Sequence, residues 1–381
     1  MKRLLVMGLF LAILAALSAQ AGAAKPQQNR VVKLTAHRVA TLAMDRTRVA
    51  YASGGRIYVW NIETGATSVV KGDYSNATHS IDPAQIAIAG KRLAWIKRVG
   101  YGNTEMSEKL YGASVAGRAH VLKQGYIFER EDSLDAVGGW IAGVVGSGKV
   151  LAVSTWHSDR GVTSRAKLNL ITPTGLHPIA AGPGSIVAEA ANDGHIAVLR
   201  SIAAWPADEP STPTTEPSVG IYSKAGKLLN EIVLDTPIPP PPSCGDCVAY
   251  PSTIQNSVAL SGDRLVVLTE TNPETGSSPW TGKVEVYDWR TGVLLHTWPL
   301  SFRPYAINVG APLAAYGKFA AIEGKQLHLL DLTTGKDTVI SGGVGSPAAL
   351  GPLGLVYAAP GRAGHGKLVF VPTSKLSVLG G

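Results

Sequence analysis

The sequence predicts an all-β fold, a seven-bladed β-propeller of four-stranded antiparallel blades preceded by a signal peptide. A short apolar phrase recurs seven times between Val49 and Leu355, at a mean step of about 51 residues, slightly above the period of a propeller blade. Each copy is flanked by two further strand-like segments, and no helical periodicity follows the leader. A unit of this length cannot bury its apolar side alone, so the copies must pack on one another.

The recurring phrase is expected to form the second strand of each blade. It starts with a basic or turn residue and continues with residues that favour strands. The copies lie at 48–51, 92–95, 149–152, 195–198, 264–267, 318–321 and 354–357.

Small residues dominate the segment just upstream of most copies, which we expect to be the innermost strand. Strands converge near the axis of a propeller and leave little room there, so alanine suits this position. These segments are 42–44, 86–88, 258–260, 313–315 and 348–350.

A third strand ends in a tight turn, and a short fourth strand follows. The closing glycine supplies the positive φ that such a turn needs, and an Asp or Asn before it can cap the turn. Third strands are expected at 58–65, 286–292 and 329–335, with shorter versions ending at Gly117, Gly175 and Gly226, and fourth strands at segments such as 67–70 and 337–340.

These patterns divide the chain into a leader at 1–24, an N-terminal segment at 25–36 that could supply a closing strand, and a propeller at 37–379. The seven blades are expected at about 37–72, 82–123, 136–181, 184–235, 252–300, 308–341 and 345–379.

The strand–turn phrase at 287–292, Tyr-Asp-Trp-Arg-Thr-Gly, resembles the repeats of TolB-like, WD-repeat-like and quinoprotein-type propellers of secreted bacterial proteins. The resemblance covers 37–379 and implies a propeller fold. Such propellers include binding, scaffolding and enzymatic members, so function must be argued from sites. The chain departs from the pattern because no blade has a Gly-His…Trp-Asp pair, and Trp298 falls off the spacing of the quinoprotein tryptophan motif.

The first 24 residues have the pattern of a secretory signal. Lys2 and Arg3 precede an apolar run at 4–17, and small-residue cleavage sites follow at 19–21 and 21–23. An uncleaved membrane anchor is the alternative, although the run is short for a span. We therefore expect an exported protein in the periplasm, the cell envelope or the extracellular space.

The charge pattern bears on possible partners. The net charge is +8, but the basic residues are scattered rather than clustered. A nucleic-acid footprint needs a concentrated basic patch with stacking aromatics, so no nucleic-acid partner is expected. Weak attraction to anionic cell-wall polymers or lipid surfaces is the better interpretation of this charge.

The only two cysteines, Cys244 and Cys247, lie close together after a proline run. We expect a local disulfide formed in an oxidising compartment. A redox motif would need a helix start, and a zinc site would need two further ligands that the nearby sequence lacks. We expect no metal.

Loop lengths indicate which face carries function. The loops between second and third strands are expected to be long at 98–108, 156–166, 201–217 and 270–282, and the proline-rich link 236–255 joins the same side. Long loops on a rigid scaffold are more often functional than decorative.

These loops carry the candidate binding residues, which are aromatic or imidazole side chains. Tryptophan and tyrosine bury a large area at small entropic cost. The candidates are Tyr101, Trp156, His157, Trp205, Tyr250 and Trp280. Acidic residues that could instead form a glycosidase pair are Asp208, Glu209, Glu216, Glu270 and Glu274.

The leading functional hypothesis is an exported, non-enzymatic and monomeric binding or scaffold propeller. It would engage a protein or a cell-envelope polymer through the loop face and need no cofactor. One alternative is a polysaccharide hydrolase or lyase, which would require carboxylates or histidines converging at the mouth of the channel. Another is a quinoprotein-like propeller, which would carry a bound chromophore.

Overall fold

The computed structural model describes most of the chain after the leader, and within this part the fold is all-β. The described residues are 31–72, 85–100, 105–129, 136–159, 162–182, 185–202, 215–234, 252–272, 281–304, 312–342, 347–361 and 364–379. The only helix among them is α2 (Thr373–Leu376), which follows the last strand. The expected signal peptide and both cysteines lie outside the described residues.

Five antiparallel sheets have four strands each, and four of these sheets are continuous in sequence. Their strands are β2 (Val39–Asp45), β3 (Arg48–Ser53), β4 (Arg56–Asn61) and β5 (Thr67–Val69); β14 (Ser185–Asn192), β15 (His195–Ile202), β16 (Thr215–Ser223) and β17 (Leu228–Val233); β18 (Ser252–Ser261), β19 (Arg264–Asn272), β20 (Thr281–Asp288) and β21 (Val293–Leu300); and β22 (Leu313–Tyr316), β23 (Phe319–Glu323), β24 (Gln326–Asp331) and β25 (Asp337–Gly342).

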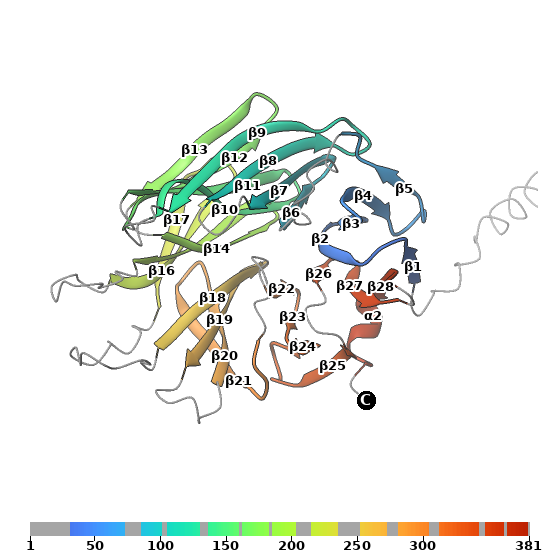
Figure 1. Ribbon diagram of the computed structural model, residues 1–381. Helices are drawn as coiled ribbons and strands as arrows, with labels where there is room; N and C mark the ends of the chain where they lie inside the picture. Colours follow the sequence, from blue (N-terminus) through green and yellow to red (C-terminus); the bar gives the residue numbers. More distant parts are fainter. Residues whose placement is uncertain are drawn as a thin grey trace, which may run out of the picture.

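The fifth four-stranded sheet joins the two ends of the chain. It consists of β26 (Ala348–Gly351), β27 (Gly354–Pro360), β28 (Gly366–Pro372) and β1 (Val31–Thr35). The N-terminal strand β1 pairs antiparallel with the C-terminal strand β28, with Val31 opposite Phe370. In Figure 1 the blue β1 accordingly lies beside the red β28.

The remaining strands form a single eight-stranded sheet where two separate blades, 82–123 and 136–181, were expected. Its strands are β6 (Gln85–Ala89), β7 (Arg92–Gly100), β8 (Glu105–Ser114), β9 (His120–Glu129), β10 (Ala136–Ser147), β11 (Val150–Asp159), β12 (Val162–Thr172) and β13 (Gly175–Gly182). The two halves join because β9 and β10 are long enough to pair at their far ends, where Tyr126 lies opposite Gly139. This sheet arches across the top of Figure 1.

The first strand of each unit lies against the first strand of the next. Contacts run in the order β2, β6, β10, β14, β18, β22 and β26, and β26 also contacts β2. Figure 1 shows the sheets fanned around these strands. Their small residues, such as Ala87 and Ala259, are buried, as expected for innermost strands.

The core consists of apolar layers between neighbouring sheets. Strand β11 illustrates how alternation builds them: Leu151 and Val153 pack with Ile96 of β7, whereas Val150 and Ala152 pack with Ile196 of β15. Both faces of a central strand are therefore buried, which explains why the recurring phrase is apolar almost throughout.

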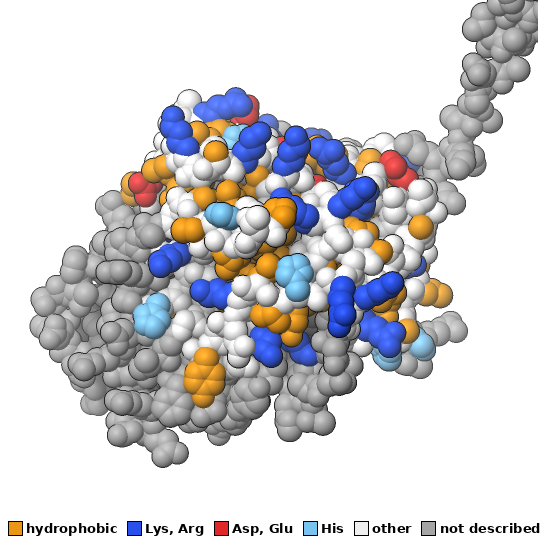
Figure 2. Space-filling view, turned by 90° about the horizontal axis from the view of Figure 1, so that it is seen from above, with side chains coloured by type: hydrophobic (Ala, Val, Ile, Leu, Met, Phe, Trp, Pro, Cys, Tyr) orange, Lys and Arg blue, Asp and Glu red, His pale blue; other side chains and the backbone are white. Residues whose placement is uncertain are grey.

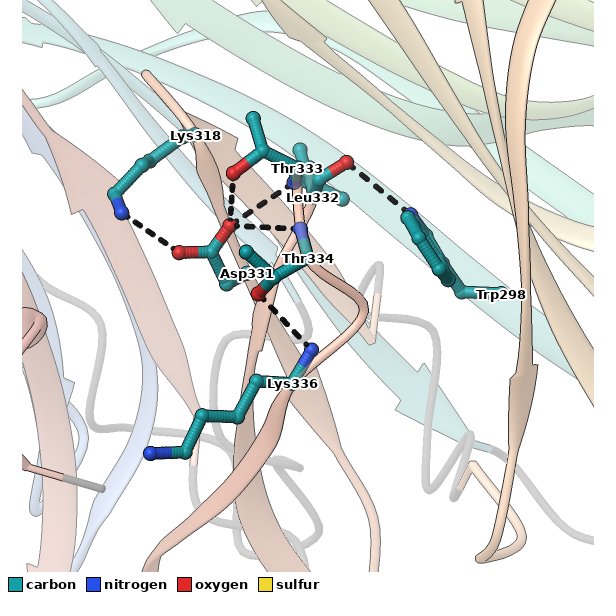
Figure 3. A network of polar contacts seen from close by, with 7 residues as sticks. All are labelled: Trp298, Lys318, Asp331, Leu332, Thr333, Thr334 and Lys336. Carbon is teal, nitrogen blue, oxygen red and sulfur yellow. Dashed lines mark hydrogen bonds and ion pairs between the residues drawn. The ribbon is translucent and has the colours of Figure 1, made fainter. Parts of the chain in front are cut away.

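Asp and Asn side chains cap the turns between third and fourth strands, as the sequence predicts. Asp331 Oδ1 accepts the amides of Thr333 and Thr334, and its Oδ2 accepts Lys318 Nζ at 2.7 Å (Figure 3). Asn61 and Asp288 cap their own turns in the same way.

Trp298 joins this turn to the neighbouring sheet. Its Nε1 donates to the carbonyl of Leu332 at 3.1 Å (Figure 3). Its ring covers Gly335, which has a positive φ of 72° and has no room for a Cβ. The tryptophan that falls outside the quinoprotein spacing thus holds two neighbouring sheets together.

Polar side chains also link the turns between first and second strands. Asp45, at the end of β2, accepts Gly90 N at 2.6 Å and Gly148 N at 3.0 Å, so it connects three successive units. The links continue with Asp193 N donating to Ser147 Oγ, Asn192 Nδ2 to Leu260 O, and Ser261 Oγ to Gly317 O. The side chains that make these links are those of Asp45, Ser147, Asn192 and Ser261, and each of these residues is the last of a first strand.

We expect Asp45→Ala to destabilise the protein more than other turn substitutions. Asp45 is buried, and its loss leaves two amide donors without their charged acceptor, which should cost about 3 kcal/mol. The measurement is the free energy of unfolding from denaturant titration. Asp263→Ala is the control, because that exposed carboxylate pairs with exposed Arg290 and should contribute about 1 kcal/mol or less. Equal losses in the two variants would contradict the linking role of Asp45.

Candidate functional site

A row of large side chains crosses one face of the eight-stranded sheet. Register places Arg98 opposite Glu108, Glu108 opposite Gly125, and Trp140 opposite Trp156. Tyr126 pairs with Gly139, so these two residues share one side of the sheet. Their neighbours Gly125 and Trp140 share the opposite side, because successive residues of a strand alternate. We call the side that carries Arg98, Glu108, Trp140 and Trp156 the tryptophan face.

Gly125 lets the two halves of the row meet. A Cβ at this position would collide with the backbone carbonyl of Gly139 on β10. With no side chain there, the guanidinium of Arg98 lies over the ring of Trp140, 4.9 Å from its centroid. Trp140 in turn contacts Trp156, with ring centroids 6.0 Å apart and planes tilted by 37°.

Arg98 and Glu108 form a buried ion pair between Nε and Oε1, with 6% and 1% of their side-chain areas exposed. The other carboxylate oxygen of Glu108 accepts Ile141 N at 2.7 Å. Burial raises the pKa of Glu108, and this outweighs the opposing effect of Arg98. Arg98 Nη2 is buried and has no hydrogen-bond partner among the described residues.

A second buried carboxylate approaches the same strand from β14. Glu189 accepts a hydrogen bond from Ser154 Oγ, which itself accepts Gly143 N at 3.1 Å. A β-bulge lies between Ile141 and Gly143, the two residues whose amides donate to Glu108 and to Ser154. Burial raises the pKa of Glu189 to about 8.

The residues predicted from the sequence are only partly brought together. Trp156 belongs to the row and is half-buried. His157 is exposed on the opposite side of the sheet, opposite Gly139. The other candidates, Tyr101, Trp205, Tyr250, Trp280, Cys244 and Cys247, lie outside the described residues.

Trp156 and His157 lie on a strand, which corrects the expectation of a long loop at 156–166. Strand β11 extends to Asp159 and β12 begins at Val162. The expected loop 98–108 is likewise mostly strand, since β7 extends to Gly100 and β8 begins at Glu105. The polar residues of these stretches belong to β7, β8, β11 and β12, which continue past the expected strand ends.

The sequence analysis missed Arg98, Glu108, Trp140 and Glu189. Glu189 carried a usable signal, because it interrupts a small-residue first strand at the place where Val144 and Val258 stand in other units. The other three residues meet only through the pairing of β9 with β10. No local pattern indicates that pairing.

The chemistry that this arrangement favours is recognition. Both carboxylates are buried and hydrogen-bonded within the fold, whereas the tryptophans are partly exposed. Of the acidic candidates for a glycosidase pair, Glu270 has a described side chain, and it is buried on β19. The described residues contain no group of three His, Cys, Asp or Glu side chains suited to a metal ion. Nor do they contain a helix that is long and apolar enough to cross a membrane.

Comparison with known proteins gives structural likeness alone. No protein-family model matches the chain, and no curated protein matches it in sequence. The β-propeller domain of the Trilobed protease from Pyrococcus furiosus is 10% identical, with 89% of this chain and 96% of that chain covered and a TM-score of 0.49. The Pan2 WD40 domain from Neurospora crassa is 12% identical, with 89% and 90% covered and a TM-score of 0.44.

The N-terminal domain of Nup159 is 10% identical, with 91% of this chain and 97% of that chain covered and a TM-score of 0.45. The chain thus resembles WD40 and β-propeller structures. At these TM-scores the likeness carries no argument about function, and the fold rests on the sheets themselves.

The raised pKa of Glu189 predicts a pH-dependent stability. An unfolded Glu titrates near 4.5, so between about pH 4.5 and pH 8 the folded state binds the extra proton and the free energy of unfolding falls as the pH rises. Glu189→Gln mimics the neutral acid. It should therefore raise Tm at pH 8.5 by about 3 °C or more and change it little at pH 5.

Differential scanning calorimetry across this pH range is the measurement. Glu231→Gln, which alters an exposed carboxylate on β17, should leave the pH profile unchanged. If Glu189→Gln shifted Tm equally at every pH, Glu189 would not be the group that titrates.

Proposed function

We propose that the protein is an exported, non-enzymatic, seven-bladed β-propeller that binds a protein or a cell-envelope polymer. The leader pattern at 1–24 supports export. The order of contacts among the seven first strands, from β2 to β26 and back to β2, supports seven blades. In this proposal β6–β9 and β10–β13 are blades two and three, and the tryptophan face on them is the binding face.

The observation that carries the proposal is the unequal length of the strands. Strands β7–β12 have 9 to 12 residues, whereas β2–β5 have 3 to 7 and β22–β25 have 4 to 6. Strands β16, β18 and β19 reach 9, 10 and 9 residues, but only the eight-stranded sheet has six consecutive long strands. Part of this added length packs on the core, since Ile141 is fully buried and Trp156 contacts the cluster around Val150 and Ile196. The added residues include Arg98, Trp140 and Trp156, which are residue types enriched at binding hot spots.

The accessible part of the cluster is aromatic. Arg98 and Glu108 are buried against each other, whereas Trp140 and Trp156 are half-buried. A ligand would therefore meet the two rings, which suit an apolar side chain of a protein or the apolar face of a sugar.

The alternative of a polysaccharide hydrolase receives less support. Two carboxylates do converge on β10, as such an enzyme would require. However, Glu108 is paired with Arg98, and Glu189 is held by Ser154. In such an enzyme the general acid must reach the glycosidic oxygen and the nucleophile must reach the sugar carbon. Glu108 and Glu189 are instead buried and hydrogen-bonded to Arg98 and Ser154.

The test is capture of a partner from envelope extract by the tagged mature protein. Arg98→Met with Trp140→Ala should weaken capture about thirtyfold or more, because a hot-spot tryptophan typically contributes about 2 kcal/mol or more. The measurement is the dissociation constant for the captured partner.

The chain offers a matched control at a turn between third and fourth strands. Arg290 lies over the ring of Trp289, 5.4 Å from its centroid, and pairs with Asp263. Arg290→Met removes a similar contact without touching the eight-stranded sheet and should leave binding unchanged. Capture that survives the change at Arg98 and Trp140 but is lost with Arg290→Met would place the binding face on the turn side of the molecule.

A further inference from the structure

The turns between first and second strands and the turns between third and fourth strands lie at one end of the molecule, because adjacent strands run antiparallel. Within a unit these two turns are hydrogen-bonded to each other. Ile62 N donates to Thr47 O at 2.9 Å, and Leu332 N donates to Lys318 O at 2.7 Å.

We call this end of the molecule the turn side. It comprises 45–48, 90–92, 148–149, 193–195, 262–264, 317–318 and 352–353 at the turns between first and second strands, 61–66, 115–118, 173–174, 224–227, 288–292 and 331–336 at the turns between third and fourth strands, and α2.

The turns of different units are held against one another. Arg92 Nη2 donates to Lys149 O at 2.6 Å, Asp45 joins the first three units, and the links described above continue to the sixth. The seventh unit approaches the first, because a Cβ on Gly351 would lie 2.7 Å from Met44 Cε. The turn side is therefore one continuous surface.

Cations outnumber acidic groups on the turn side, where the structure describes every residue. Thirteen Lys and Arg and six Asp and Glu lie in these ranges. Asp45, Asp288 and Asp331 accept backbone amides within the fold. Asp263 pairs with Arg290. The other two acids are Glu63 and Asp193. The net charge of this surface is therefore positive.

The side view of Figure 2 shows a similar excess. It looks onto the eight-stranded sheet from above, and the Lys and Arg side chains drawn in colour far outnumber Asp and Glu.

Exposed apolar residues adjoin these cations at one sector of the turn side. Strand β17 starts with 228–229, directly after Lys227, and β21 starts with 293–295. Asn230 Nδ2 donates to Trp289 O at 2.7 Å, so the starts of the two strands come close together. We call these residues, which are 43% to 55% exposed, the apolar rim: Leu228, Leu229, Val293, Leu294 and Leu295.

We propose that the turn side binds a membrane surface that contains anionic lipids. A broad positive surface matches a plane of lipid phosphates, and each Lys or Arg near such a plane adds to the attraction. The apolar rim adds burial of side chains at the lipid interface, which strengthens binding beyond the electrostatic attraction. A soluble polyanion would meet the same cations but would gain nothing from the apolar rim.

Binding through the turn side leaves the tryptophan face accessible. Strands β10 and β11 are joined at the turn side by 148–149, whereas Trp140 and Trp156 pair near the other end of these strands. The proposal is independent of the proposed function, because it uses other residues and another ligand.

The test measures binding of the tagged mature protein to vesicles of phosphatidylglycerol and phosphatidylcholine in 0.1 M NaCl, where charges more than about 10 Å apart are largely screened. Vesicles of phosphatidylcholine alone are the neutral surface. Lys91→Gln with Lys149→Gln removes two exposed cations of the turn side and should weaken binding about tenfold.

The matched control removes the same charge from the opposite end of the molecule. Arg56 and Lys325 are exposed at turns between second and third strands. Arg56→Gln with Lys325→Gln should change affinity less than about twofold.

A second pair of variants tests the apolar rim. Leu228→Ser should weaken binding to the same vesicles about threefold or more. Leu34→Ser is its control, because Leu34 is 78% exposed but lies opposite Lys367, at the end of β28 away from the turn side. This control should change affinity less than about twofold.

Polyphosphate distinguishes a soluble polyanion from a membrane. The proposal holds if the anionic vesicles bind more tightly than neutral vesicles and, per phosphate, than polyphosphate, and if only the turn-side variants lose affinity. It is overturned if neutral vesicles bind equally well, if polyphosphate binds more tightly, or if either variant loses no more affinity than its control. Circular dichroism and Tm of each variant show that the fold is intact.

Discussion

The pairing of Tyr126 with Gly139 is the contact on which the candidate site depends. It joins two four-stranded units into one sheet and fixes which side chains share a face. A shift of one residue in this pairing would put Trp140 and Trp156 on the opposite side of the sheet from Arg98 and Glu108, because side chains alternate along a strand. The collision that a Cβ on Gly125 would make with the Gly139 carbonyl shows how closely the two strands approach.

The polar groups around this contact come at an energetic cost that an apolar repeat would avoid. Glu189 occupies a position where two other units have valine, and burial keeps its carboxyl largely neutral at pH 7. The Arg98–Glu108 pair likewise requires two charged groups to leave water, and replacing such pairs with apolar residues is often neutral or stabilising. Departures of this kind from a repeat are expected where function, rather than folding, sets the residue type.

The sequence predicted the repeated part of the fold well and the candidate site poorly. The recurring phrase and the small-residue strands form the second and first strands, and Asp331 caps its turn as expected, because these features arise within one unit. The merger of β6–β9 with β10–β13 depends on edge pairing between units, which no local pattern encodes. Trp156 was identified by its residue type but assigned to a loop, whereas Arg98 and Trp140 become partners only through long-range register.

Hydrogen–deuterium exchange of the protein with its captured partner tests the central claim that the extended strands of the eight-stranded sheet carry the binding face. The account predicts added protection in peptides covering 92–100, 105–114, 136–147 and 150–159, with little change across β22–β25. Protection concentrated instead at the turns between first and second strands, such as 45–48 and 261–264, would contradict it.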